Sequence, residues 1–257
     1  MKPLAAFNLL FILLAPCRVF GVDVSKPQTF DSKGVAIQYT IEGKGEPVVL
    51  IHGLHSSADM NWRLPGIIKT LAGNHQVVAL DVRGHGHSGK PEGEGAYGVE
   101  MAEDVLRLLD HLKIEKAHVV GYSMGGMIAM KLATLHPVRV RSMALGGMGW
   151  EREDSPLADF WNMLPEREAT RTPAACVRSL GALAVKEDEV KAIRIPTIII
   201  VGDRDPVKKL YVVPLEHIRP DWPTKIIDGA GHINCIFKPQ FKEELKKWLD
   251  MEAGVKD

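Results

Sequence analysis

The stretch Gly121-Tyr122-Ser123-Met124-Gly125 decides how this chain is expected to fold. An apolar run, residues 117–121, precedes the serine, and residues 126–133 have the composition of a closely packed helix. A serine between two glycines, where a buried strand passes into a helix, matches a sharp turn that exposes the serine as a nucleophile. The hydroxyl then lies at a helix N-terminus, where backbone N–H groups favour negative charge.

The bulk composition limits the chain to one sizeable domain. At 257 residues it accommodates an α/β domain with an insertion, whereas two complete domains would be cramped. The 32 basic residues equal the 32 acidic residues, so no net charge attracts nucleic acid or an anionic membrane surface. The sequence therefore predicts no nucleic-acid partner, and it leaves the oligomeric state open.

Residues 1–21 have the pattern of a signal peptide. A single charge precedes an apolar run, residues 4–16, which is shorter than the about 20 residues that a bilayer-spanning helix needs. Val19-Phe20-Gly21 fits a cleavage site, so we expect export to a periplasm, lumen or exterior, with no stable membrane anchor after cleavage. The alternative is an uncleaved leader that anchors the protein. The sequence before Cys17 resembles a bacterial lipobox, but Pro16 departs from that pattern.

Apolar runs that alternate with amphipathic segments predict βαβ units, and hence a mainly parallel, twisted sheet flanked by helices. We expect the core of this α/β fold in two parts, residues 22–147 and 193–257. The expected strands are 35–41, 47–51, 76–80, 117–121, 140–145, 195–201 and 224–227, and the expected helices include 62–71, 99–112, one that stops at His136-Pro137, and one that begins at Pro239.

Residues 148–192 interrupt this alternation and contain no buried strand. Ser155-Pro156 and Thr172-Pro173 each have the pattern of a helix start. We therefore expect a short helical cap over the carboxyl ends of the strands. Its apolar cluster includes Trp150 and Trp161, which either form the small core of the cap or also line a substrate pocket.

Residues that carry chemistry follow several of the predicted strands. His52-Gly53 follows one strand, Ser123 another, Asp205 a third, and His232 follows the last strand. Ligands of a parallel sheet bind at the carboxyl ends of its strands, so these residues are expected to meet. The order serine, aspartate, histidine along the chain distinguishes one serine-triad fold from the others.

These motifs resemble those of the α/β-hydrolase fold family, in particular its branch of esterases, lactonases and cofactor-free haloperoxidase-like enzymes. The resemblance extends over about residues 35–249. It includes Asp81-Val82-Arg83-Gly84-His85-Gly86-His87-Ser88, which is similar to the D-x-R-G-x-G-x-S turn of that branch. The resemblance implies that Ser123 is the nucleophile, His232 the general base and Asp205 the acid of a catalytic triad.

The resemblance implies further roles in the same loops. Asp203 and Asp205 share one loop, and in similar proteins the acid is the aspartate three residues after the glycine, which here is Asp205. The oxyanion hole is expected from the backbone N–H groups of Leu54 and Met124. Since Leu54 contributes only its main chain to that hole, its side chain is expected to line the substrate pocket.

The implied activity is hydrolysis of a small or medium carboxylic ester through an acyl-enzyme, without a cofactor. An imidazole suits the role of base because its ordinary pKa of about 6.5 lies close to working pH. The alternative is a lactone hydrolase or a C–C bond hydrolase with the same triad, and Asn61-Trp62 is similar to a pair found in C–C hydrolases of this fold. Perhydrolysis and a non-catalytic, ligand-binding role are further alternatives.

No metal is predicted. Two pairs of histidines have close spacing, His52-x-x-His55 and His85-x-His87, but neither has a carboxylate or cysteine cluster at ligand spacing. We expect structural hydrogen bonds from these residues instead. After loss of the leader two cysteines remain, Cys176 and Cys235, which either pair in an exported protein or stay as buried free thiols; a core of this size favours free thiols.

Overall fold

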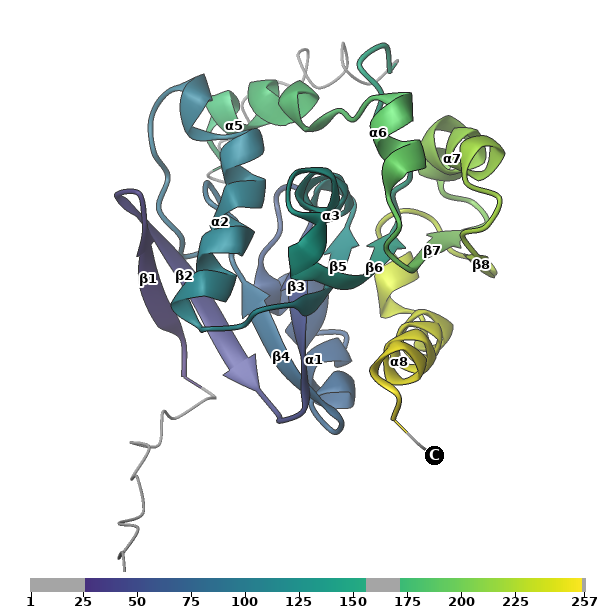
Figure 1. The fold of residues 1–257 in the computed structure, drawn as a ribbon, viewed down its shortest axis with the longest axis horizontal. Helices are drawn as coiled ribbons and strands as arrows, with labels where there is room; N and C mark the ends of the chain where they lie inside the picture. The colour runs from purple at the N-terminus through teal and green to yellow at the C-terminus, as the bar shows by residue number, and fades with distance from the viewer. Residues whose placement is uncertain (1–25, 156–171, 256–257) are drawn as a thin grey trace, which may run out of the picture.

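One mixed sheet organises the fold. The computed structural model describes residues 26–155 and 172–255, and in these residues eight strands lie in the order β1-β2-β4-β3-β5-β6-β7-β8 (Figure 1). β1–β2 and β2–β4 pair antiparallel, and all the other neighbours pair parallel. The strands are β1 (Gln28–Ser32), β2 (Val35–Glu42), β3 (Glu46–Ile51), β4 (His75–Leu80), β5 (Ala117–Tyr122), β6 (Val140–Gly146), β7 (Thr197–Gly202) and β8 (Thr224–Ile227).

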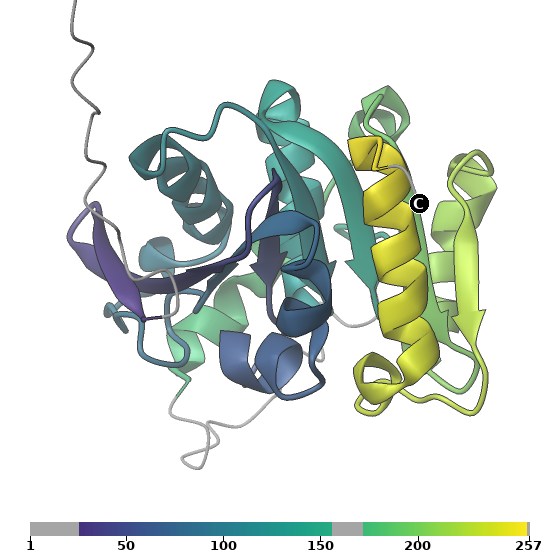
Figure 2. The same cartoon turned by 90° about the horizontal axis from the view of Figure 1, so that it is seen from below.

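Helices cover both faces of the sheet (Figures 1 and 2). The helices α2 and α3 pack on one face, and α1 and α8 pack on the other, where α8 lies in front of the sheet in Figure 2. Among the helices of the described ranges, none combines the length and the apolarity needed to cross a bilayer. The helices are α1 (Ile67–Leu71), α2 (Val99–His111), α3 (Met124–Leu135), α5 (Ala174–Arg178), α6 (Glu187–Ala192), α7 (Val213–Ile218) and α8 (Pro239–Ala253).

The core consists of two buried apolar clusters, one on each face. Side chains of a strand point alternately to opposite faces. Val49 and Ile51 of β3 accordingly belong to the cluster under α2 and α3, whereas Val48 and Leu50 belong to the cluster under α1 and α8. Because β3 is buried on both faces, its sequence is a continuous apolar run, and the mainly parallel sheet predicted from such runs is confirmed.

One strand is absent from the sequence prediction. β1 pairs with β2 across the turn Lys33-Gly34, in which both residues have positive φ, 54° and 81°. This is the backbone that a tight two-residue hairpin requires. The segment carries Asp31 and Ser32 and lies at the edge of the sheet, so it lacks the apolar run that identifies the inner strands.

The single helix expected over residues 62–71 is wrong. The structure has a short π-helix, Asp59–Arg63, and then α1 (Ile67–Leu71). Gly66 separates them with a left-handed backbone, φ 77°. Trp62, Ile67, Ile68 and Leu71 are all buried, so their helical spacing reflects two consecutive turns on one face rather than one helix.

Between β6 and β7 the described residues form helices and no strand. α5 follows directly after Thr172-Pro173, the second expected helix start. The helix expected from Ser155-Pro156 onward lies outside the described residues. Cys176 of α5 is a free, buried thiol, and so is Cys235, in agreement with the favoured prediction.

The strand register brings the loops that carry the candidate site residues together at the carboxyl ends of the strands. Ile51 lies beside Gly121, so the loop after β3 is adjacent to the turn after β5. Gly202 lies beside Ile227, so the loops after β7 and β8 are adjacent too. The carboxyl ends of these parallel strands therefore assemble the candidate site.

Candidate active site

The turn between β5 and α3 holds Ser123 in an unusual backbone conformation, φ 53° and ψ −120°. A Cβ atom on Gly121 would lie 2.0 Å from the carbonyl oxygen of Gly125, and one on Gly125 would lie 2.0 Å from that of Ile51. Only glycine fits at these two positions, because backbone approaches backbone. The Ser123 N–H donates to the Gly146 carbonyl of β6 at 2.8 Å, which anchors the turn to the neighbouring strand.

The structure brings Ser123, His232 and Asp205 together. His232 Nε2 lies 2.9 Å from Ser123 Oγ, and His232 Nδ1 lies 2.8 Å from Asp205 Oδ2. When Nδ1–H donates to the carboxylate, Nε2 is left to accept the serine proton. The Asp205 side chain is fully buried, and its other oxygen accepts the N–H of Val207 at 2.9 Å. This arrangement can hold the imidazole in one tautomer and stabilise the imidazolium.

The second aspartate of the loop has a different contact. Asp203 Oδ1 accepts the backbone N–H of Ala230 at 2.9 Å, and the Arg204 N–H donates to the Ala230 carbonyl at 3.0 Å. These bonds fasten the loop that leads to His232. Asp203 therefore supports the histidine loop, whereas Asp205 contacts the imidazole itself.

The two expected oxyanion donors come from two loops that meet near Ser123. Met124 is the first residue of α3, and the first N–H groups of a helix have no acceptor inside that helix. Leu54 follows Gly53 in the loop after β3. The Gly53 N–H is held by Asn61 Oδ1 at 2.8 Å, and a Cβ atom on Gly53 would lie 3.3 Å from Ser123 Cβ. The loop of Leu54 thus runs close beside Ser123.

A cavity of about 200 Å³ opens onto Ser123 and His232. Leu54, expected from the sequence at the substrate pocket, is among its lining residues. Its outer part is apolar and exposed, with Met60 at 56% and Ile233 at 84% of their surface accessible. The cavity is lined by Gly53, Leu54, Ser56, Met60, Asn61, Tyr122, Ser123, His232, Ile233 and Phe237.

For Trp150 the sequence left two roles open, the core of the cap or the lining of a substrate pocket, and the structure places it in the core. Trp150 is buried at 7% exposure and does not line this cavity. Its indole Nε1–H donates to the Val185 carbonyl at 2.7 Å, which fixes the ring inside the core that includes the cap residues. Trp161 lies outside the described residues.

The closely spaced histidines make structural contacts. The buried His52 donates from Nδ1 to the Gly53 carbonyl at 2.7 Å, and its Nε2 accepts the Val82 N–H at 3.0 Å. Burial lowers the pKa of His52 to about 4 and that of His85 to about 3, so both rings are neutral at pH 7. His87 is largely exposed. Within the described residues, no three His, Cys, Asp or Glu side chains are grouped as metal ligands would be.

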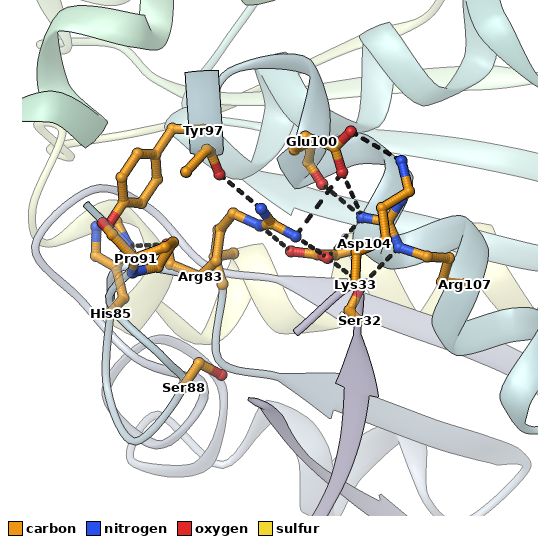
Figure 3. Close-up of polar contacts among 12 residues, drawn as sticks. Ser32, Lys33, Arg83, His85, Ser88, Pro91, Tyr97, Glu100, Asp104 and Arg107 are labelled. Atoms are coloured by element: carbon orange, nitrogen blue, oxygen red, sulfur yellow. Dashed lines mark hydrogen bonds and ion pairs between the residues drawn. The ribbon is translucent and has the colours of Figure 1, made fainter. Parts of the chain in front are cut away.

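The D-x-R-G-x-G-x-S turn is held by buried polar contacts. Asp81 Oδ1 accepts the Ala58 N–H at 2.9 Å, and Ser88 Oγ donates to the Asp81 carbonyl at 2.6 Å. Figure 3 shows Arg83 in two bonds to Asp104 of α2, each 2.6 Å long. The turn therefore shapes the region behind the oxyanion loop rather than supplying a reacting group.

Sequence reasoning missed one residue of the site. Tyr122, which stands immediately before Ser123, donates its hydroxyl proton to the backbone carbonyl of His232 at 2.5 Å. Tyr122 occupies a variable position of the G-x-S-x-G pattern, so the pattern assigns it no role. Its partner lies in a loop far along the chain, and only the fold brings the two together.

A family model described as the alpha/beta hydrolase fold matches residues 46–188. The chain therefore belongs to the α/β-hydrolase fold family, as its motifs imply. Solved structures agree with this assignment. One of them, a membrane phospholipase A described as a bacterial virulence factor, covers 90% of this chain and 88% of its own, with 25% identity and a TM-score of 0.67.

Several curated relatives have names of hydrolases of different kinds, and two are named as dihydrolipoyllysine-residue acetyltransferase components of acetoin cleaving systems. A protein named as the carbamate hydrolase RutD of Azorhizobium caulinodans is 38% identical over 56% of this chain and 52% of its own length. The 3-oxoadipate enol-lactonase 1 of Acinetobacter baylyi is 31% identical over 67% of this chain and 77% of its own length. The 2-hydroxy-6-oxo-6-(2'-aminophenyl)hexa-2,4-dienoic acid hydrolase of Metapseudomonas resinovorans is 27% identical over 86% of this chain and 90% of its own length. The chain spans about half or less of the length of the first curated relatives that it matches.

Proposed function

We propose that this protein is a serine hydrolase that cleaves a small or medium carboxylic ester through an acyl-enzyme. The observation that carries the proposal is the continuous contact from Ser123 Oγ through His232 to the buried Asp205, in a cavity at the carboxyl edge of the sheet. A serine hydroxyl becomes a useful nucleophile when a base in hydrogen-bond contact accepts its proton. Hydrolase relatives with lactonase and esterase names support the same class of reaction.

The proposed reaction has two steps, formation of the acyl-enzyme and its hydrolysis, and His232 acts as the base in both. Ser123 Oγ attacks the ester carbonyl carbon while His232 Nε2 accepts the hydroxyl proton, and the Leu54 and Met124 N–H groups stabilise the oxyanion. His232 then gives this proton to the departing alkoxide, which leaves as an alcohol. Water attacks the acyl-enzyme with His232 again as the base. The acid product is released and the serine is regenerated.

The proposed substrate size rests on the cavity. A volume of about 200 Å³ is below the range of about 300–1,000 Å³ usual for drug-sized ligands, so it suits a short acyl or alkyl group. Leu54, Met60, Ile233 and Phe237 give the cavity an apolar lining. We therefore expect a preference for short, apolar esters over charged ones.

Hydrolysis of p-nitrophenyl esters of graded chain length tests this proposal. We expect the wild-type protein to turn over the shorter esters and Ser123→Ala to lose about 10⁴-fold or more in kcat, because the nucleophile is gone. Ser179→Ala is a matched control, since it removes a buried hydroxyl that donates to the Cys176 carbonyl, and it should retain activity. Turnover by Ser123→Ala equal to that of the wild type would contradict the proposal.

A lactone or C–C bond is the second candidate target of the same triad. Asn61 lines the cavity while its Oδ1 holds the Gly53 N–H, so its amide nitrogen is available to a polar group of a substrate. The lactonase and dienoic acid hydrolase relatives support this candidate. Comparison of kcat/KM for an ester, a lactone and a vinylogous diketone of similar size decides between them.

A further inference from the structure

The geometry points to Tyr122 as a positioning residue, which fastens the loop of His232 to the turn of Ser123. This inference rests on the proposed serine-hydrolase function and adds to it. The Tyr122 hydroxyl donates to the backbone carbonyl of His232 at 2.5 Å, and the side chain of Tyr122 is 4% exposed. Since Tyr122 is bonded covalently to Ser123, one residue joins the nucleophile directly to the backbone of its base.

The ring of Tyr122 lies in a slot beside two glycines, Gly146 at the end of β6 and Gly147 directly after it. A Cβ atom on Gly146 would lie 2.7 Å from Tyr122 Cδ2, and one on Gly147 would lie 3.1 Å from the hydroxyl oxygen. The Phe241 ring of α8 meets the Tyr122 ring edge to face at 5.8 Å. Burial also raises the pKa of the Tyr122 hydroxyl well above its ordinary value, so the hydroxyl keeps its proton and remains a donor.

The loop that carries His232 needs such a support. It follows β8, which is the edge strand of the sheet, and Ile233 next to the histidine is 84% exposed. On the N-terminal side of His232, Asp203 holds the Ala230 N–H. The Tyr122 ring also lies against the imidazole of His232, with the ring centroids 5.8 Å apart. Tyr122 therefore holds the histidine through both its hydroxyl and its ring.

Tyr122 influences the reaction indirectly, because it holds His232 in position beside Ser123. The contact from His232 Nε2 to Ser123 Oγ is 2.9 Å long, so a small shift of the histidine loop breaks it. Misplacement of a reacting group by about 1 Å reduces a rate by about 100-fold. Loss of the Tyr122 hydroxyl is therefore expected to slow the chemical step more than it weakens substrate binding.

Tyr122→Phe tests the inference, with Tyr97→Phe as a matched control. Tyr97 is also buried, at 3% exposure, and its hydroxyl also donates to a backbone carbonyl, that of Pro91 at 2.7 Å. Both variants keep the ring and lose one buried hydroxyl, so we expect similar decreases in Tm. Only Tyr122→Phe should lower kcat, by about 10-fold or more, with KM within about 2-fold of the wild-type value.

A second readout separates this inference from the choice of substrate. A fluorophosphonate labels a serine that a histidine activates, so its second-order rate constant reports the Ser123–His232 contact without any ester. The rates are measured well below the Tm of each variant. We expect a decrease of about 10-fold or more for Tyr122→Phe and none for Tyr97→Phe. If the wild type and Tyr122→Phe are labelled equally fast, the inference is wrong while the proposed function stands. If the wild type is not labelled, both are wrong.

Discussion

Ser123 is held in a backbone conformation that non-glycine residues rarely adopt. Such a conformation costs on the order of 1–3 kcal/mol and persists only where the surroundings determine it. The surroundings here are the turn glycines Gly121 and Gly125, pressed against neighbouring backbone, and the Ser123 N–H bond to Gly146 of β6. The strain is therefore offset by packing in the centre of the sheet, and it places the hydroxyl at the start of α3.

Asp205 and Asp203 provide a matched pair of substitutions at this scale. Asp205→Asn removes the carboxylate that fixes the His232 tautomer, so we expect kcat to decrease on the order of 10³- to 10⁴-fold. Asp203→Asn keeps an oxygen that can accept the Ala230 N–H, and it should retain kcat within about 3-fold, since a bond to a backbone N–H survives. Steady-state kinetics of both variants measure the difference.

The opposite ranking of the two aspartate variants would contradict the assignment of Asp205 to the imidazole. Equal, small losses in both variants would also contradict it. Circular dichroism of each variant shows that the loss of rate is not a loss of fold.

At the residue scale the sequence predicts identities better than contacts. The triad residues stand in recognisable patterns, because each pattern reflects a local backbone requirement such as the glycines around Ser123. The roles of Tyr122 and Asn61 depend instead on partners outside their own motifs, the His232 carbonyl and the Gly53 N–H. Trp150 shows the converse case, since an aromatic residue near the expected pocket is bonded to Val185 and does not line the cavity.

At the scale of elements, a buried ionic network joins parts of the chain that are distant in sequence. Arg83 and Asp104 are 3% and 1% exposed, and Asp104 also accepts the hydroxyl proton of Ser32 at the end of β1. Arg107 of α2 contacts Ser32 and Asp104 as well (Figure 3). The network thus connects the β1–β2 hairpin, α2 and the loop after β4.

Asp104→Asn is expected to reduce the free energy of unfolding by about 3 kcal/mol, because it leaves the buried Arg83 cation with only the Glu100 carboxylate, 3.9 Å away, as a counter-charge. Glu187→Gln is the control, since Glu187 and Lys191 form a pair with both side chains about half exposed. Such surface pairs contribute about 0–1 kcal/mol. Urea unfolding of both variants measures the two values. A loss below about 1 kcal/mol in Asp104→Asn would show that Arg83 finds other partners.

The elements themselves were predictable to different extents. Inner strands such as β3 and β7 are covered on both faces, so their apolar runs identify them. The edge strand β1 has no such run, and it exists because the Lys33-Gly34 turn returns it along β2. The break at Gly66 is likewise invisible in the helical spacing, because the residues on both sides of it are buried on one face.

At the scale of the whole molecule, buried titratable groups couple stability to pH. Burial lowers the pKa of His52 and His118 to about 4 and that of His85 to about 3. Each takes up a proton in the unfolded chain below about pH 6.5 but stays neutral in the folded protein. Burial raises the pKa of Glu151 to about 7. Between about pH 4.5 and pH 7 the folded protein therefore keeps a proton on Glu151 that the unfolded chain has released.

These contributions have opposite signs, and the three histidines outweigh the one carboxyl. Between about pH 6 and 4.5 the unfolded state binds a net two more protons, so stability should fall with acidification by about 3 kcal/mol per pH unit. Glu151→Gln removes the opposing contribution and should make the fall steeper. Urea unfolding of both proteins across this range measures the slopes. An equal or shallower slope for Glu151→Gln would contradict this account.

The order of the strands has a consequence for the growing polypeptide. Ser123 belongs to the centre of the sheet and comes from the first half of the chain, while Asp205 and His232 follow β7 and the edge strand β8. The chain is synthesised from its N-terminus, and a domain generally folds as a unit. A nascent chain that already contains the serine turn still lacks Asp205 and His232. For the proposed hydrolase, we therefore expect a ribosome-bound chain to stay inactive until the segment through His232 has emerged and docked.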